Sequence, residues 1–116
     1  MNGERIAQGS SGIARWCKWY LLDAVQGNDD GVWVDTDGFY PLSVQVVGVI
    51  AASVPVCGSH ALRLPPNTDH GSTITRDILR DTLIPIPMPV SWLKCRVTKH
   101  KVGIITVILE GMGGNV

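Results

Sequence analysis

Clusters of turn-forming residues divide this chain into short apolar segments. Glycine, aspartate, asparagine and proline gather at 27–31, 35–38 and 65–71, and these residue types favour the backbone conformations of tight turns. The segments between the clusters are rich in valine, isoleucine and aromatic residues, which favour β-strands. The pattern therefore predicts an all-β protein, a single β-sandwich or jelly-roll-like domain of about seven to eight short antiparallel strands.

Strands are expected at 14–25, 32–34, 39–50, 53–58, 92–98 and 104–109. Within the third of these, Leu42, Val44 and Val46 alternate with polar residues, which indicates a strand with one buried face. The β-branched run at 104–109 predicts a strand buried on both faces. We expect this strand to pair with 92–98 as a hairpin.

The remaining segments are expected to differ in conformation: one is extended, one is either helical or a strand with a turn, and one is flexible. Prolines at alternate positions remove N–H donors from 84–89, so this segment is expected at a sheet edge or in a crossover. Segment 72–83 fits either a short helix or a strand followed by a turn. Glycine and serine in residues 1–13 predict a flexible N-terminal arm. The sandwich domain then covers 14–111, and 112–116 form a loose tail.

The charge composition excludes several classes of partner. The 116 residues suffice for one domain, and Lys plus Arg equal Asp plus Glu, so the formal net charge is zero. Nucleic acids and anionic membranes attract an excess of basic side chains, so we expect neither as a partner. Only 17% of the residues are charged, below the usual value of roughly a quarter. This deficit predicts that part of the surface contacts other proteins, including further copies of the chain. The sequence shows neither a signal peptide nor an apolar run of membrane-spanning length, which predicts a soluble protein.

We expect no metal and no other cofactor. The cysteines Cys17, Cys57 and Cys95 are far apart and form no C-x-x-C pair, which argues against structural zinc and fits reduced thiols, with one disulfide as the alternative. The histidines are as widely separated, at His60, His70 and His100. Four aspartates near two turns offer oxygen ligands for calcium: Asp29, Asp30, Asp35 and Asp37. Because the rest of an EF-hand loop is missing, two solvated turns are preferred over calcium binding.

No catalytic constellation stands out, so we expect that the protein is not an enzyme and that it takes no small-molecule ligand. Ser59 precedes His60, and one loop contains Asp69, His70 and Ser72. The chain has no G-x-S-x-G motif, and the three residue types do not occur in a strand–turn–helix context. A small hydrolase that uses Ser59 or Ser72 with His70 is the weakest alternative.

Aromatic side chains allow a second kind of binding function. The larger ones are Trp16, Trp19, Tyr20, Trp33, Tyr40 and Trp92. Packing in the core or at a subunit interface is the preferred interpretation, because tryptophan and tyrosine are enriched in both. A row of exposed rings would instead make the domain a carbohydrate-binding β-sandwich module.

The order of segments carries a family resemblance. The segments are LLDAVQGNDDGVWVDTDGFYPLSVQVVGV at 21–49, SVPVCGS at 53–59, WLKCRVT at 92–98 and ITVILEG at 105–111. This order, over most of the chain, resembles small virion proteins of tailed bacteriophages, which are β-sandwich or jelly-roll proteins of similar length. The chain departs from their pattern at 60–63, where His-Ala-Leu-Arg replaces a polar turn, and at the proline-rich 84–89.

The resemblance implies a virion structural protein that is made in the host cytoplasm. Its expected role is that of a capsid decoration or cement subunit bound to the major capsid protein or other virion proteins, with a neck or tail accessory role as the alternative. We also expect a homo-oligomer. The candidate contact residues lie in the arm, in the loop at 65–70 and in 85–89: Ile6, Ile13, Pro65, Pro66, His70, Pro85, Pro87 and Pro89.

Overall fold

The computed structural model describes residues 1–11 and 14–113. Every regular element in these residues is a strand: β1 (Arg5–Ser11), β2 (Ala14–Val25), β3 (Val34–Asp35), β4 (Phe39–Val47), β5 (Ala51–Ser53), β6 (Val56–Ser59), β7 (Ser72–Thr73), β8 (Thr82–Pro85), β9 (Trp92–Cys95), β10 (Thr98–Val102) and β11 (Ile105–Gly113). The predicted all-β fold, a single β-sandwich-like domain, is confirmed.

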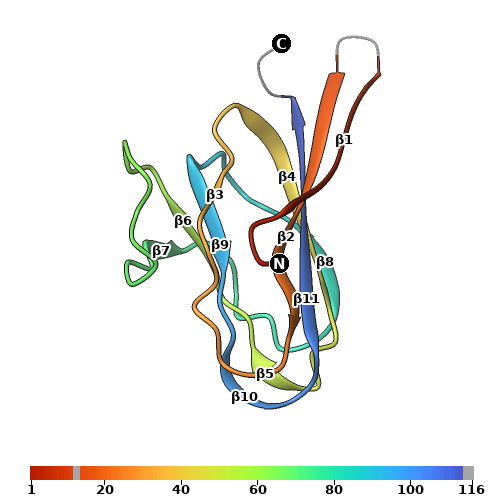
Figure 1. The fold of residues 1–116 in the computed structure, drawn as a ribbon, viewed down its shortest axis with the longest axis vertical. Helices are drawn as coiled ribbons and strands as arrows, with labels where there is room; N and C mark the ends of the chain where they lie inside the picture. Colours follow the sequence, from red (N-terminus) through yellow and green to blue (C-terminus); the bar gives the residue numbers. More distant parts are fainter. Residues whose placement is uncertain (12–13, 114–116) are drawn as a thin grey trace.

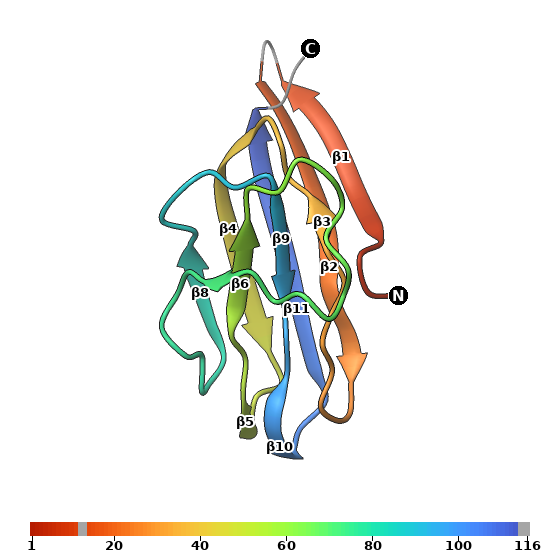
Figure 2. The same ribbon diagram turned by 90° about the vertical axis from the view of Figure 1, so that its left-hand side faces the viewer.

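The strands form two layers that face each other (Figure 1). One layer is a five-stranded sheet in the order β1-β2-β11-β4-β8, and the other is a four-stranded sheet in the order β3-β9-β6-β7. The short pair β10-β5 lies at one end of the molecule. Figure 2 shows that the long connection from β6 to β7 runs across the outer side of the four-stranded sheet.

The core fills the space between the two sheets. Fully buried residues alternate along the central strand of the larger sheet and along its neighbour β4: Ile105, Val107 and Leu109 of β11, and Leu42, Val44 and Val46 of β4. Val56 of β6 and Leu93 of β9 meet them from the opposite sheet. Trp19 and Phe39 add an edge-to-face aromatic pair, with ring centroids 5.2 Å apart and planes at 89°. The period-two alternation expected for 39–50 is therefore confirmed up to Val47.

Residues 5–11 belong to a strand, which corrects the prediction that they form part of a flexible arm. Strand β1 pairs antiparallel with β2, with Gly9 opposite Trp16. A Cβ at Gly9 would come within 2.6 Å of the Trp16 ring, so the indole packs directly on the glycine backbone. Glycine here permits close packing, whereas the composition alone suggested flexibility. Residues 12 and 13 of the predicted arm lie outside the described residues.

The predicted hairpin between 92–98 and 104–109 is wrong. Strand β9 pairs with β3 and β6 in one sheet, whereas β11 lies between β2 and β4 in the other. Strand β10 connects them at the end of the molecule, where it pairs with β5. Residues along β11 alternate between buried and half-buried, so one face meets the core rather than both. The strand also continues to Gly113 and includes the start of the predicted tail, while 114–116 lie outside the described residues.

The ambiguous and proline-rich segments form edges. Segment 72–83 contains β7 and the start of β8, with Ile78 in an isolated bridge to Val54, so the helical alternative is wrong. Strand β8 pairs only with β4 and forms one edge of the five-stranded sheet. The edge position predicted from the prolines of 84–89 is therefore confirmed for β8.

Gly48 directly follows β4 and has a backbone conformation that other residues rarely adopt, with φ of +87°. A Cβ at this position would lie 1.8 Å from the carbonyl oxygen of Ile104. We predict that Gly48→Ala lowers the free energy of unfolding by at least about 2 kcal/mol, measured by denaturant titration. Gly27→Ala is the matched control, because no atom lies within 4 Å of its added Cβ, and it should change stability little. Equal effects of the two substitutions would contradict the prediction.

Candidate partner interface

An apolar groove of about 600 Å³ lies on the β8 side of the sandwich. The segment at 74–80 forms one wall, and β8 with the proline that follows forms the other. The apolar residues that line it are Ile74, Ile78, Leu79, Ile84, Pro85 and Pro87. Exposed charged residues also line it: Arg76, Asp77 and Arg80. Apolar contacts bordered by charged side chains are the usual anatomy of a protein–protein interface.

Two leucines near this groove are largely exposed. Leu79 in the groove wall is 63% exposed, and Leu83 of β8 is 68% exposed. Leu83 lies opposite Gln45, on the outer face of the five-stranded sheet. Covering a leucine side chain stabilises by about 1.5–3 kcal/mol, so a partner that covers this side of the molecule gains apolar contact.

The prolines at 85 and 87 remove hydrogen-bond donors from the outer edge of β8. The amide of Ile86 donates to the carbonyl of Leu42 in β4, at 2.8 Å. Because successive amides of an extended strand point to opposite sides, the nitrogens of Leu83, Pro85 and Pro87 point away from β4. Two of these three have no N–H. The edge is therefore poorly suited to adding a strand, and a partner at this edge binds through side-chain contacts in the groove.

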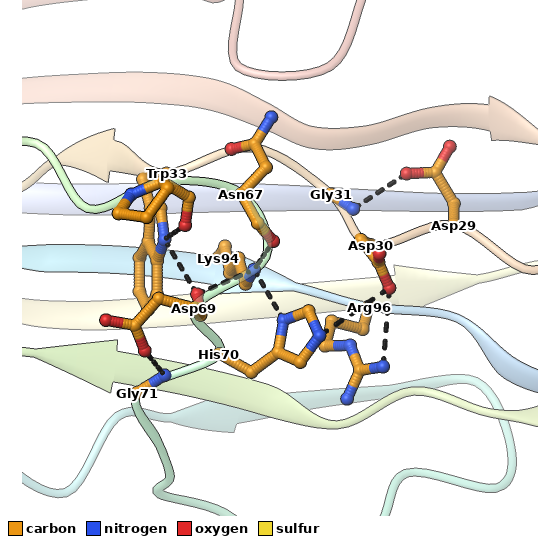
Figure 3. A network of polar contacts seen from close by, with 11 residues as sticks. Asp29, Asp30, Gly31, Trp33, Asn67, Asp69, His70, Gly71, Lys94 and Arg96 are labelled. Atoms are coloured by element: carbon orange, nitrogen blue, oxygen red, sulfur yellow. Dashed lines mark hydrogen bonds and ion pairs between the residues drawn. The ribbon is translucent and has the colours of Figure 1, made fainter.

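A second site, which is polar, lies between the loop at 65–71 and the outer side of the four-stranded sheet. Lys94 of β9 is 0% exposed, although it is charged. Figure 3 shows its ammonium directed at the loop, where it donates to the carbonyls of Asn67 (2.9 Å) and Asp69 (3.1 Å) and lies 2.8 Å from Nδ1 of His70. Three donors with three acceptors satisfy the ammonium.

Trp33 also hydrogen-bonds to the backbone of this loop. Its indole N–H lies 3.3 Å from the carbonyl of Pro66 and 3.1 Å from that of Asp69. The Lys94 ammonium lies 4.9 Å from the centre of the Trp33 ring, which is a cation–π contact. Lys94 and Trp33 together fix the loop on the sheet.

Burial changes the acid–base properties of this region. It lowers the pKa of the Lys94 ammonium below its ordinary value, an effect that the negative charge of Asp30 and Asp69 opposes. Burial also raises the pKa of the Cys57 thiol, against the positive charges of Arg96 and Lys94. Cys95, in the core, has its pKa raised by burial as well. The cysteines are free thiols, as the sequence predicted, and the thiols of Cys57 and Cys95 are poorly reactive while covered.

The predicted contact residues fall at separate places on the molecule. Pro85 and Pro87 line the groove, whereas Pro89 lines a smaller hollow beside Tyr40 and His60. Ile6 is partly exposed on β1, and Ile13 lies outside the described residues.

In the predicted loop, Pro65 is buried and Pro66 is exposed. The Pro66 carbonyl accepts from Trp33, and His70 contacts Lys94. Of the predicted contact residues that the structure describes, Pro85 and Pro87 share the groove, and Pro65, Pro66 and His70 share the loop.

The residues considered for catalysis make other contacts. Nδ1 of His70 faces Lys94 and Nε2 lies 3.9 Å from Asp30, so neither nitrogen is directed at Ser59 or Ser72. The Ser59 hydroxyl accepts from the amide of Ala61. This geometry gives no support to the hydrolase alternative.

The aspartates considered for calcium serve turns and an ion pair. Asp29 accepts from the amide of Gly31, Asp35 accepts from the amide of Asp37, and Asp30 pairs with Arg96 at 3.3 Å. Within residues 1–11 and 14–113, no group of three or more His, Cys, Asp or Glu side chains is arranged to hold a metal ion.

The aromatic residues are spread over several parts of the molecule. Trp19 and Trp33 are buried. Trp16 and Tyr20 are half-buried on β2, and their partners in β11 are Met112 and Ile108. Tyr40 belongs to β4 of the five-stranded sheet, and Trp92 belongs to β9 of the four-stranded sheet. The Trp92 indole donates to the carbonyl of Ala61. The six rings do not form one exposed row.

Sequence reasoning missed the groove residues of 74–80 and the buried lysine. Leu79 occurs in a segment whose conformation was ambiguous, so its exposure could not be assigned. Lys94 alternates with apolar residues in 92–98, which predicts a solvent-facing side chain. Only the long connection that folds over the sheet buries it.

The proline edge generates a prediction about association. Replacing both prolines, in Pro85→Ala/Pro87→Ala, restores two outward N–H donors, one on β8 and one just after it. We expect the variant to self-associate more strongly than wild type as concentration rises, measured by size-exclusion chromatography with light scattering. Pro66→Ala, at an exposed loop proline, is the control and should behave as wild type. If the double variant and wild type have the same mass at every concentration, the prolines do not protect the edge.

The buried ammonium generates a prediction about stability. We expect Lys94→Met, which keeps most of the side-chain volume, to lower the free energy of unfolding by about 2 kcal/mol, because the Asn67 carbonyl loses its donor. Lys101→Met, at an exposed lysine, should change stability by less than about 0.5 kcal/mol. Denaturant unfolding measures both. A Lys94→Met variant as stable as wild type would mean that desolvation of the ammonium offsets its hydrogen bonds.

Comparison with known proteins gives no assignment: no protein-family model, no curated protein and no solved structure matches the chain. In the part of the chain that the structure describes, no helix has the length and apolar character needed to cross a membrane. Function is therefore inferred from the surfaces of the molecule itself.

Proposed function

We propose that this protein is a structural subunit that attaches to other proteins through the apolar groove beside β8. The observation that carries the proposal is the exposure of Leu79 in a groove lined by Ile74, Ile84 and two prolines. Contact with water at this groove is unfavourable, and a partner side chain that fills it removes that cost.

The specific role that we propose is that of a capsid decoration or cement subunit of a tailed bacteriophage. The resemblance of segment order to small virion proteins supports this role, and the zero net charge is compatible with dense packing on a shell. A neck or tail accessory role uses the same surface and is the alternative. In either role, the partner is a neighbouring virion protein with an apolar segment.

The charged residues of the groove can orient a partner protein, in addition to the attraction that the apolar residues provide. Arg76 and Arg80 carry positive charge at its lining, with Asp77 between them in sequence. Charged side chains at the rim of an interface mainly set orientation and association rate. On a symmetric shell, each modest contact is repeated, so many weak sites give firm attachment when one subunit touches several neighbours.

Co-sedimentation tests this proposal. Shells assembled without this protein are mixed with wild type, Leu79→Glu or Leu62→Glu, and tails are run in parallel. We expect saturable binding of wild type to shells, and at least tenfold weaker binding of Leu79→Glu, because a charge in the groove resists desolvation.

Leu62→Glu is the matched control, since Leu62 is a fully exposed leucine that does not line the groove. It should bind as wild type does. Binding to tails alone would favour the accessory role. Wild-type binding to neither particle would contradict the virion role, and equal binding by both variants would exclude the groove as the contact.

A further inference from the structure

The contact with the Lys94 ammonium determines which nitrogen of His70 accepts a hydrogen bond. An ammonium has protons but no lone pair, so the Nδ1 atom 2.8 Å away must be the acceptor. The imidazole proton is therefore on Nε2, which faces Asp30 Oδ1 at 3.9 Å. The loop is held in this form by a neutral histidine, because an imidazolium has no acceptor nitrogen left for Lys94.

We propose that His70 is the pH-sensitive part of a latch: its protonation releases the loop at 65–71 from the four-stranded sheet. In the closed state, Lys94 connects the carbonyls of Asn67 and Asp69 with the His70 ring (Figure 3). Protonation replaces the contact between Nδ1 and the ammonium with repulsion between two cations. The ring must then turn away, and the chain on either side of it moves with the ring.

The charges around His70 favour opening over simple rearrangement. Lys94 from β9 and Arg96 just after it are the cations that face this region, and Asp30 is already paired with Arg96 at 3.3 Å. The carboxylate of Asp69 accepts from the amide of Gly71 within the loop itself. A protonated His70 therefore adds a third positive charge to Lys94 and Arg96, in a region where the carboxylates of Asp30 and Asp69 carry the negative charge.

Opening uncovers a thiol that reports on the latch. Cys57 is the cross-strand partner of Lys94, so both side chains lie on the same outer face of the sheet. Cys57 is 1% exposed. Gly71, at the end of the loop, passes so close that an added Cβ would lie 2.4 Å from the carbonyl of Gly58. Cys17 and Cys95 instead belong to the core between the sheets and stay covered when the loop moves.

The experiment measures labelling of Cys57 from about pH 7.5 to about pH 5, the range in which imidazole side chains take up a proton. The probe is a dithiodipyridine, a disulfide reagent that reacts with thiols at acidic as well as neutral pH. Mass spectrometry of peptides gives the rate for each cysteine. A denatured sample at each pH corrects for the intrinsic reactivity of the reagent.

We expect corrected labelling of Cys57 to rise at least about tenfold on acidification, the factor that loss of one charge-assisted hydrogen bond gives. Labelling of Cys17 and Cys95 should stay slow, which separates loop opening from unfolding. In His70→Asn the amide oxygen replaces Nδ1 as the acceptor and does not titrate. This variant should stay closed at both pH values.

His70→Ala provides the opposite control, because it removes the acceptor at every pH. Its Cys57 should label quickly at neutral pH, without further change on acidification. Labelling of wild-type Cys57 that is independent of pH would overturn the proposal. An equal acceleration in His70→Asn would also overturn it, since the response would then come from another group.

Discussion

Burial of one face of β11 between β2 and β4 is the constraint on which the rest of the molecule depends. Ile105, Val107 and Leu109 lie on this face, and all are fully buried against the opposite sheet. Because β11 pairs with β2 on one side and with β4 on the other, the apolar layer extends across the sheet. Because this layer satisfies the hydrophobic requirement of the fold, the outer faces and edges are free to carry other chemistry.

The region around Lys94 is a second, polar layer built outside that core. A buried charge is stabilising only when its donors are satisfied, and here the carbonyls of a loop distant in sequence satisfy them. The loop thus depends on the lysine for its position, while the lysine depends on the loop for its partners. Such mutual dependence makes the region sensitive to a change in one proton, whereas the main core cluster consists of apolar residues and cysteines.

Alternation of apolar and polar residues predicted where strands occur better than it predicted which strands pair. The pattern of Leu42, Val44 and Val46 identified a half-buried strand because period-two alternation is a property of the strand itself.

The false hairpin between β9 and β11 has a different origin: sequence proximity favours pairing, but a sandwich also sends consecutive strands to opposite sheets. Lys94 and Leu79 show the same limit for the candidate sites. Lys94 is buried by the distant loop at 65–71, and Leu79 lies in a segment whose conformation local alternation left open. The prolines of 85 and 87, by contrast, indicated an edge from the sequence alone, because a missing N–H is a local property.

The proline edge gives the five-stranded sheet a direction in which it can grow. Along β8 and the two residues that follow it, two of three outward nitrogens lack a proton, whereas β1 at the opposite edge has no proline. A sheet with two open edges can add copies without limit and form fibres. With a single open edge in this sheet, two copies that pair through β1 leave only proline-blocked edges at the ends of the combined sheet, so growth through the five-stranded sheet closes at two. For growth through this sheet, the position of two prolines therefore separates a finite pair from an endless filament.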